Sequence, residues 1–191
     1  MPDLLPLFLN LCGRRVVLVG AGPVAAQKLP QLLAAGADVL VVAPEVHPAI
    51  AASPVTIERR PFTPSDLDGA WLVVAAAPPA INREVAAAAE VRQLLVNAVD
   101  DPPNASAYLG GVVRRDGVTV AISTSGAAPA IAGLMREAID AVLPRDLRDW
   151  MHVAGDERIV WKRDGVPMEQ RRPLLLQALN RLYEDRELVK P

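Results

Sequence analysis

The sequence has few of the residues that build cross-links and metal clusters. It contains one cysteine, Cys12, and two histidines, His47 and His152, in 191 residues. A single cysteine excludes an intrachain disulfide and a cysteine-clustered metal site, and it favours a reducing, cytoplasmic compartment. The histidines are isolated and show no metal-ligand spacing. We therefore expect no metal site.

An excess of charge and long apolar stretches are also lacking. Twenty Lys and Arg residues against 22 Asp and Glu residues give a net charge of −2, so composition gives no support to binding of nucleic acid or anionic membranes. The longest apolar runs, such as residues 71–77, are far shorter than the ~20 residues that cross a bilayer. The first residues lack a basic region and a cleavage site, so we expect a mature protein.

The chain does contain short apolar runs that alternate with helical patterns. The runs lie at residues 16–19, 38–42, 55–57, 71–75 and 94–96, and helices are predicted over 24–35 and 81–92. Strands that are apolar on both faces and alternate with helices favour a parallel sheet covered on each side. The sequence therefore predicts an α/β fold of the Rossmann type for residues 1–104.

The pattern changes after residue 104. Extended runs at 108–113 and 118–122 flank Arg114–Gly117, and the Asp-Gly pair there predicts a hairpin turn. A helix that ends at Pro144 follows, and a last amphipathic helix is predicted over 173–183. The first of these helices has an apolar stripe made of Ile131, Leu134, Met135, Ala138, Val142 and Leu143. We expect a small α+β region over residues 105–144 and a helical part over 145–191.

Gly20-Ala-Gly22-Pro-Val-Ala25 matches the dinucleotide fingerprint, with alanine in the third position. Gly20 permits a sharp turn, Gly22 lets the backbone approach a pyrophosphate, and Pro23 suits the first position of a helix. The alternative is a tight turn without a ligand. Because the motif follows a strand and opens a helix, we favour a bound dinucleotide.

The turn after the second strand lacks the usual ribose-binding acid, since Val42 is followed by Ala43 and Pro44. Glu45 is the nearest carboxylate, and no Arg or Lys occupies that turn. A ribose phosphate would meet a negative group there, so the sequence favours NAD over NADP.

Two further segments carry polar groups near expected strand ends. Asp100 and Asp101 follow the fifth strand, and they line a ligand crevice or cap a local turn. Ser123 and Thr124 precede a helix, where their hydroxyls cap the helix or the nearby N–H groups hold an anion. Residues alone leave both pairs of alternatives open.

These segments together resemble the precorrin-2 dehydrogenase family, the N-terminal module of siroheme synthase. The resemblance covers residues 3–150 and is carried by Leu5–Gly13, Val19–Lys28, Leu95–Pro102 and Val120–Ala130. It implies an NAD-binding Rossmann domain, a central dimerisation region, a helical C-terminal part and a homodimer. The chain has no methyltransferase segment after these motifs, so we do not expect the trifunctional enzyme.

The resemblance also implies roles for individual residues. Gly22, Pro23 and Val24 would meet the pyrophosphate, and Pro44 with Glu45 the adenosine end of NAD. Asp100 takes the position of the family's important aspartate, and Thr124 that of a hydroxyl near the tetrapyrrole.

The resulting hypothesis is an NAD-dependent oxidation of precorrin-2 to sirohydrochlorin. Asp100 is the candidate general base, because a sheltered carboxylate can have its pKa raised towards the working pH. Arg114, Arg115 and Arg136 are candidate partners of the substrate carboxylates, although two adjacent arginines also suit a solvated hairpin end. Insertion of iron into sirohydrochlorin stays open, and the rival interpretation is a non-catalytic NAD-sensing module.

Overall fold

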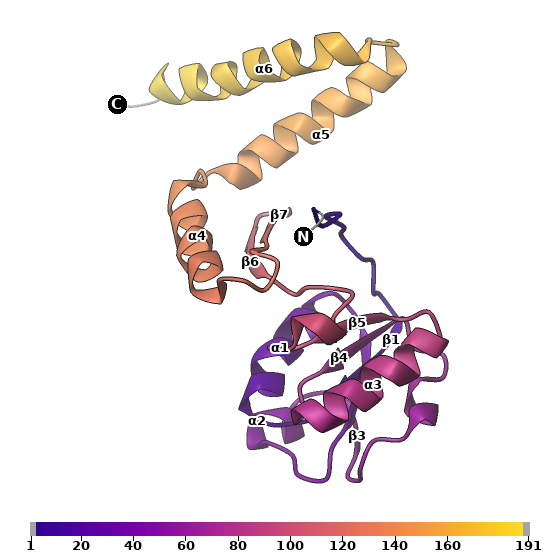
Figure 1. Cartoon of the computed structure of the whole chain (residues 1–191). Helices are drawn as coiled ribbons and strands as arrows, with labels where there is room; N and C mark the ends of the chain where they lie inside the picture. Colours follow the sequence, from indigo (N-terminus) through magenta and orange to yellow (C-terminus); the bar gives the residue numbers. More distant parts are fainter. Residues whose placement is uncertain (1–2, 189–191) are drawn as a thin grey trace. The chain divides into compact units, whose positions relative to one another are not determined.

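The computed structural model describes residues 3–188 and divides them into two compact units. The first unit comprises the chain up to Leu109 together with Ser123–Pro129. The second comprises Gly110–Ile122 and the chain from Ala130 onwards. Figure 1 shows the course of the chain through both units. Residues 110–122 thus belong to the second unit, and the loop that follows them, Ser123–Pro129, belongs to the first.

A five-stranded parallel sheet with the strand order β3-β2-β1-β4-β5 forms the centre of the first unit. Its elements are β1 (Arg15–Val19), α1 (Pro23–Ala34), β2 (Asp38–Val42), α2 (Pro48–Ala51), β3 (Thr56–Glu58), η1 (Pro64–Leu67), β4 (Leu72–Ala75), α3 (Pro79–Val91), β5 (Leu95–Ala98) and η2 (Pro102–Asn104). The chain order reverses at β1, which places a topological switch point between β1 and β4. The predicted Rossmann-type α/β sheet is confirmed.

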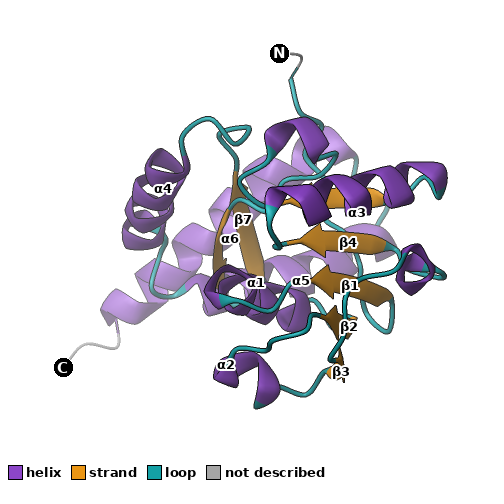
Figure 2. Cartoon of the chain, turned by 60° about the horizontal axis from the view of Figure 1, so that its bottom comes forward, coloured by secondary structure: helices purple, strands orange, loops and turns teal. Residues whose placement is uncertain are grey.

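Helices flank the sheet (Figure 2), and alternate residues of β1 pack on its opposite faces. On one face Val16 and Leu18 of β1 pack with Leu29 of α1 and with α2. On the other face Val17 of β1 packs with Val85 of α3 and with η1. This two-sided burial explains why the strands read as continuous apolar runs.

The second unit contains an antiparallel hairpin and three helices. They are β6 (Gly111–Arg115), β7 (Val118–Ile122), α4 (Pro129–Val142), α5 (Leu147–Arg163) and α6 (Met168–Leu188). Trp161 of α5 is buried, and Trp150 Nε1 donates a hydrogen bond of 2.6 Å to the Tyr183 hydroxyl, which joins α5 to α6. None of the described helices combines the length and hydrophobicity needed to span a membrane.

Two local predictions for this unit are wrong. Arg114 and Arg115 lie within β6, opposite Thr119 and Val118, and not in the turn. The turn consists of Asp116 and Gly117 alone, both with positive φ, because an Asp-Gly pair suffices for a two-residue hairpin turn. The last helix starts five residues earlier than predicted, at Met168, and includes Pro173 near its N-terminal end.

The predicted apolar faces of α4 and α6 differ in burial. Leu174, Leu175 and Leu179 of α6 are half-buried, as expected for a face packed on another helix. The α4 residues Leu134 and Val142, in contrast, are 66% and 77% exposed. Most of the apolar stripe of α4 is therefore exposed.

Candidate functional site

The loop that follows β1 is held by backbone hydrogen bonds at the carboxyl edge of the sheet. Gly20 N–H donates to Val42 O at 2.9 Å, and His47 N–H donates to Ala21 O at 2.9 Å. Gly20 has φ +94°, and a Cβ built there would lie 2.3 Å from Ala76 O. Only glycine fits this position, because any side chain would collide with the backbone after β4.

Beyond Gly20 the loop opens to solvent and exposes the N-terminal end of α1. A Cβ built on Gly22 meets no atom within 4 Å, and no side chain caps α1. The N–H groups of Val24 and Ala25 have no intrahelical partner at this end, and the helix dipole is positive there. Open space beside free donors fits the diphosphate of a dinucleotide.

The adjacent loops after β2 and β4 are also fixed in place. Pro44 and Glu45, which follow β2, are exposed. After β4, Ala77 N–H donates to Asn82 Oδ1 at 3.0 Å. Asn82 is 3% exposed within an otherwise apolar helix face, and a lone amide in such a face is a sequence signal of a buried polar contact. This amide fixes the backbone of the β4–α3 loop, which lies against the glycine loop at Gly20.

The two aspartates after β5 have different roles. Asp101 Oδ2 accepts a hydrogen bond from Asn104 Nδ2 at 2.8 Å, so it caps a local turn. Asp100 has no side-chain partner among the described residues, is exposed and adopts φ +55°. The described chain therefore does not bury the Asp100 carboxylate, contrary to the sheltered position expected from the sequence. A free carboxylate at a strand end is available to a ligand.

The loop Ser123–Pro129 packs in the same unit beside the segment after β5. A Cβ built on Gly126 would lie 3.3 Å from Pro102 Cγ and 3.6 Å from Tyr108 Cε1. Thr124 Oγ1 accepts a hydrogen bond from Ala128 N–H at 3.3 Å, and Ser123 Oγ accepts one from Ser125 N–H at 3.1 Å. The hydroxyls thus cap backbone ahead of α4. Gly126 thus meets residues 24 and 18 positions earlier in the sequence at this place.

The three candidate arginines lie in the second unit. Arg115 donates to Leu143 O at 2.8 Å and to Asp140 O and Oδ1 at 2.9 and 2.7 Å, so its guanidinium caps the C-terminal end of α4. These contacts use three of the five N–H donors of its guanidinium, and its role as a substrate partner stays a prediction. Arg136 contacts Glu137 at 3.2 Å, and Arg114 is exposed without a partner in the described part of the chain.

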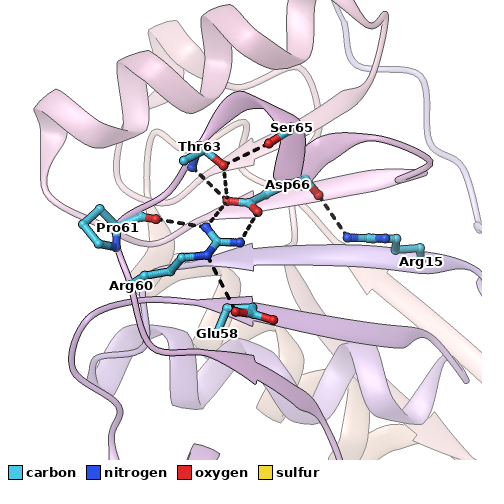
Figure 3. A network of polar contacts seen from close by, with 7 residues as sticks. All are labelled: Arg15, Glu58, Arg60, Pro61, Thr63, Ser65 and Asp66. Carbon is cyan, nitrogen blue, oxygen red and sulfur yellow. Dashed lines mark hydrogen bonds and ion pairs between the residues drawn. The ribbon is translucent and has the colours of Figure 1, made fainter.

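A second polar network lies between β3 and η1 (Figure 3). Asp66, 6% exposed, accepts hydrogen bonds from Arg60 at 2.6 and 2.9 Å and from Thr63 N–H at 2.8 Å. The Arg60 guanidinium holds the pKa of the Asp66 carboxyl below its usual range, against the opposing effect of burial. Arg15 also donates to Asp66 O at 3.4 Å. Because its groups bond to one another, this network is structural.

Metal ligands do not gather at either place. Within the described residues no group of three or more His, Cys, Asp or Glu side chains is arranged to hold a metal ion.

Asn97 of β5 is buried, donates to Ala107 O at 3.0 Å, and has an Oδ1 without a partner among the described atoms.

These features define a dinucleotide-binding protein: a Rossmann-type sheet with a glycine loop at its switch point and a free carboxylate two strands away. The chain belongs to the putative NAD(P)-binding family, whose model matches residues 7–111.

Known proteins confirm the resemblance expected from the sequence. The chain is 42% identical over 183 residues to a siroheme synthase of Photorhabdus laumondii. The aligned region covers 93% of this chain and 39% of that protein. It is 44% identical over 161 residues to siroheme synthase 1 of Cronobacter sakazakii, covering 82% and 34%. The chain thus spans about two fifths or less of the length of these relatives.

The fold matches that of a solved protein. The structure of SirC, a precorrin-2 dehydrogenase, superposes with a TM-score of 0.70 at 24% identity and covers 91% of this chain and 88% of that one. The comparison confirms the expected architecture of a Rossmann-type sheet followed by a small hairpin region and C-terminal helices.

Proposed function

We propose that this protein oxidises precorrin-2 to sirohydrochlorin with NAD, a step of siroheme biosynthesis. One observation carries the proposal: the Asp100 segment and the Ser123–Pro129 loop pack together in the unit that holds the glycine loop. The identity to siroheme synthases supports the choice of substrate.

The backbone of the glycine loop holds the cofactor in this proposal. Gly20, Gly22, Pro23 and Val24 line the diphosphate, which accepts hydrogen bonds from the N–H groups at the start of α1, such as that of Val24. Pro44 with Glu45 receives the adenosine ribose. When bound, NAD supplies an acceptor for a hydride. Open space at Gly22 and the absence of a side-chain cap on α1 support this role.

Asp100 accepts the proton in this proposal. Precorrin-2 loses two hydrogens, one as a hydride and one as a proton, and the products are sirohydrochlorin, NADH and the proton on the Asp100 carboxylate. A base must reach the proton that it removes, so a free and exposed carboxylate suits the role better than Asp101, which is already bonded.

Precorrin-2 carries several carboxylates, which require cationic or hydrogen-bonding partners. Arg114, Arg115 and Arg136 stay candidate partners through charge-assisted hydrogen bonds, as do Ser123 and Thr124 with the N–H groups beside them. The free guanidinium of Arg114 supports its assignment.

We further propose a cytoplasmic homodimer. Ile131, Leu134, Met135 and Val142 expose a contiguous apolar face on α4, and such faces mark interfaces between proteins. A second copy of residues 105–144 would cover this face. A single cysteine supports a reducing compartment.

Turnover of precorrin-2 tests the proposal. We expect NADH and sirohydrochlorin to form in equal amounts when purified protein receives precorrin-2 and NAD. Calorimetric binding of NAD without oxidation of the tetrapyrrole would instead favour the NAD-sensing module. Incubation of sirohydrochlorin with iron, without NAD, tests the separate ferrochelatase activity.

A further inference from the structure

The loop that carries Asp100 is closed by hydrogen bonds between β5 and the chain that follows the loop. Ser106 N–H and Ala107 N–H both donate to Val96 O, at 2.9 and 2.8 Å, and Val96 N–H donates to Ser106 Oγ at 2.8 Å. The chain therefore leaves β5, forms residues 99–105 and returns to the same strand. We call these residues, which include Asp100, the Asp100 loop.

Asn97 of β5 supplies a further bond of this closure from a buried position. It is 6% exposed, and its Nδ2 donates to Ala107 O at 3.0 Å. At the start of the loop, Val99 N–H donates to Ala75 O at 2.9 Å. Asp100 thus follows a residue that is tied to the end of β4, and the segment to which the loop returns is tied to Asn97.

Stability alone does not account for an amide at position 97. The other buried residues of β5, Val96 and Ala98, are apolar, and Asn97 lies opposite Val74 of β4. The Asn97 Oδ1 atom has no partner among the described atoms. A buried acceptor without a partner costs free energy, which an apolar side chain of similar shape would avoid. Residues that break the pattern of their element are expected where function requires them.

We propose that Asn97 is a positioning residue for Asp100: its bond to Ala107 O holds the Asp100 loop in the conformation that presents the Asp100 carboxylate to the substrate. This inference rests on the proposed function, because it takes Asp100 as the base that removes the proton. Asp100 adopts φ +55°, a conformation that is uncommon outside glycine and persists where the surrounding structure fixes it. Misplacement of a reacting group by about 1 Å can lower a rate about 100-fold, so a loosened loop should slow the reaction.

A double-mutant cycle with Asp100→Asn, measured on the full chain, tests the role of Asn97. Asn97→Leu should lower the rate of precorrin-2 oxidation by about 10- to 100-fold, because leucine has a similar shape but donates no hydrogen bond. The dissociation constant of NAD should change less than about twofold. In the Asp100→Asn background the same substitution should lower the rate less than about twofold, since the group that Asn97 positions is gone. Single-turnover reactions with protein in excess over precorrin-2 give the four rates.

Asn180→Leu, the same substitution at an exposed amide of α6, is the matched control and should leave the rate unchanged. Circular dichroism checks that each variant folds, and Asn97→Ala, which removes the donor without filling the space, replaces Asn97→Leu in the cycle if that variant does not fold. An unchanged rate in the Asn97 variant, or an equal loss in both backgrounds, overturns this inference alone. Wild-type protein that forms no NADH from precorrin-2 and NAD contradicts the proposed function itself.

Discussion

In the first unit Val16, Val17 and Leu18 of β1 are completely buried, whereas in the second unit Leu134 and Val142 of α4 keep most of their surface exposed. Among the described residues, the buried apolar side chains of the second unit are Val113, Ala132, Leu147 and Trp161. The first unit therefore has a complete core of its own. The second leaves apolar residues of α4 exposed, and the proposed homodimer would cover them.

Within the first unit, the residues that stabilise the fold are also different from the candidate reactive residues. The strands and helices supply closed apolar layers, and the candidate reactive groups lie on the loops that leave the carboxyl edge of the sheet. Loops on a rigid scaffold are the usual place for binding and catalytic residues. Substitutions in the loops should therefore change turnover, and substitutions in the apolar layers should change the free energy of unfolding.

The largest effect is expected at Asp100. Asp100→Asn should lower precorrin-2 turnover by about 10²- to 10⁴-fold, because it removes the proposed base while asparagine tolerates the positive φ. NAD binding and the midpoint of thermal unfolding should stay unchanged. Steady-state NADH formation measures the loss.

Asp101→Asn is the matched control for that variant. It alters the neighbouring carboxylate, which is bonded to Asn104, and turnover should stay within a few-fold of the wild type. Equal losses in both variants would assign the effect to the turn and remove the base from Asp100.

A core truncation compares the two units directly. Leu18→Ala should lower the free energy of unfolding by about 2–5 kcal/mol, because a fully buried side chain leaves a cavity. Leu134→Ala, at an exposed position, should change the stability of the monomer by less than about 0.5 kcal/mol. Urea unfolding at a protein concentration below the dimer dissociation constant gives both values, and similar losses would refute the contrast.

The third effect, on dimerisation, is expected at the apolar face of α4. Leu134→Asp places a charge in the proposed interface and should raise the dimer dissociation constant at least tenfold, about 1.4 kcal/mol. Analytical ultracentrifugation measures the equilibrium. A wild-type chain that stays monomeric at high concentration would contradict the homodimer, and Leu176→Asp on the exposed side of α6 serves as the control.

The smallest effect concerns the Arg60–Asp66 pair. Asp66→Asn should destabilise the protein by about 1 kcal/mol at neutral pH. The native pKa of Asp66 is lowered, so its contribution is complete above its unfolded pKa, about 3.9, and is lost as pH falls through the lower native value. The wild type and the variant should therefore converge in acid, as measured by urea unfolding at several pH values.

The sequence predicts the strands of the first unit well, because each strand is marked by apolar residues and by turn residues next to it in sequence. The second strand matches its predicted bounds, 38–42, since its residues are apolar and turn signals flank it. The Arg60–Asp66 network was missed, although an acid three residues after Thr63 is a common sign of a capped turn.

Features that depend on contacts distant in sequence were harder to predict. The association of Arg115 with the end of α4 joins residues 25 and 28 positions apart, whereas the local sequence around Arg114 and Arg115 predicts a hairpin turn. Glu58 lies 15 positions after Ala43, and only the pairing of β2 with β3 brings their backbones together at one edge of the sheet. Sequence spacing also could not show that the α4 stripe is left exposed.

A crystal structure of the protein with saturating NAD tests the central claim most directly. The account predicts the diphosphate on the backbone of Gly20–Val24 and the nicotinamide at the sheet edge that carries Asp100. A dinucleotide bound elsewhere, or a glycine loop that stays without one at saturating NAD, would contradict it.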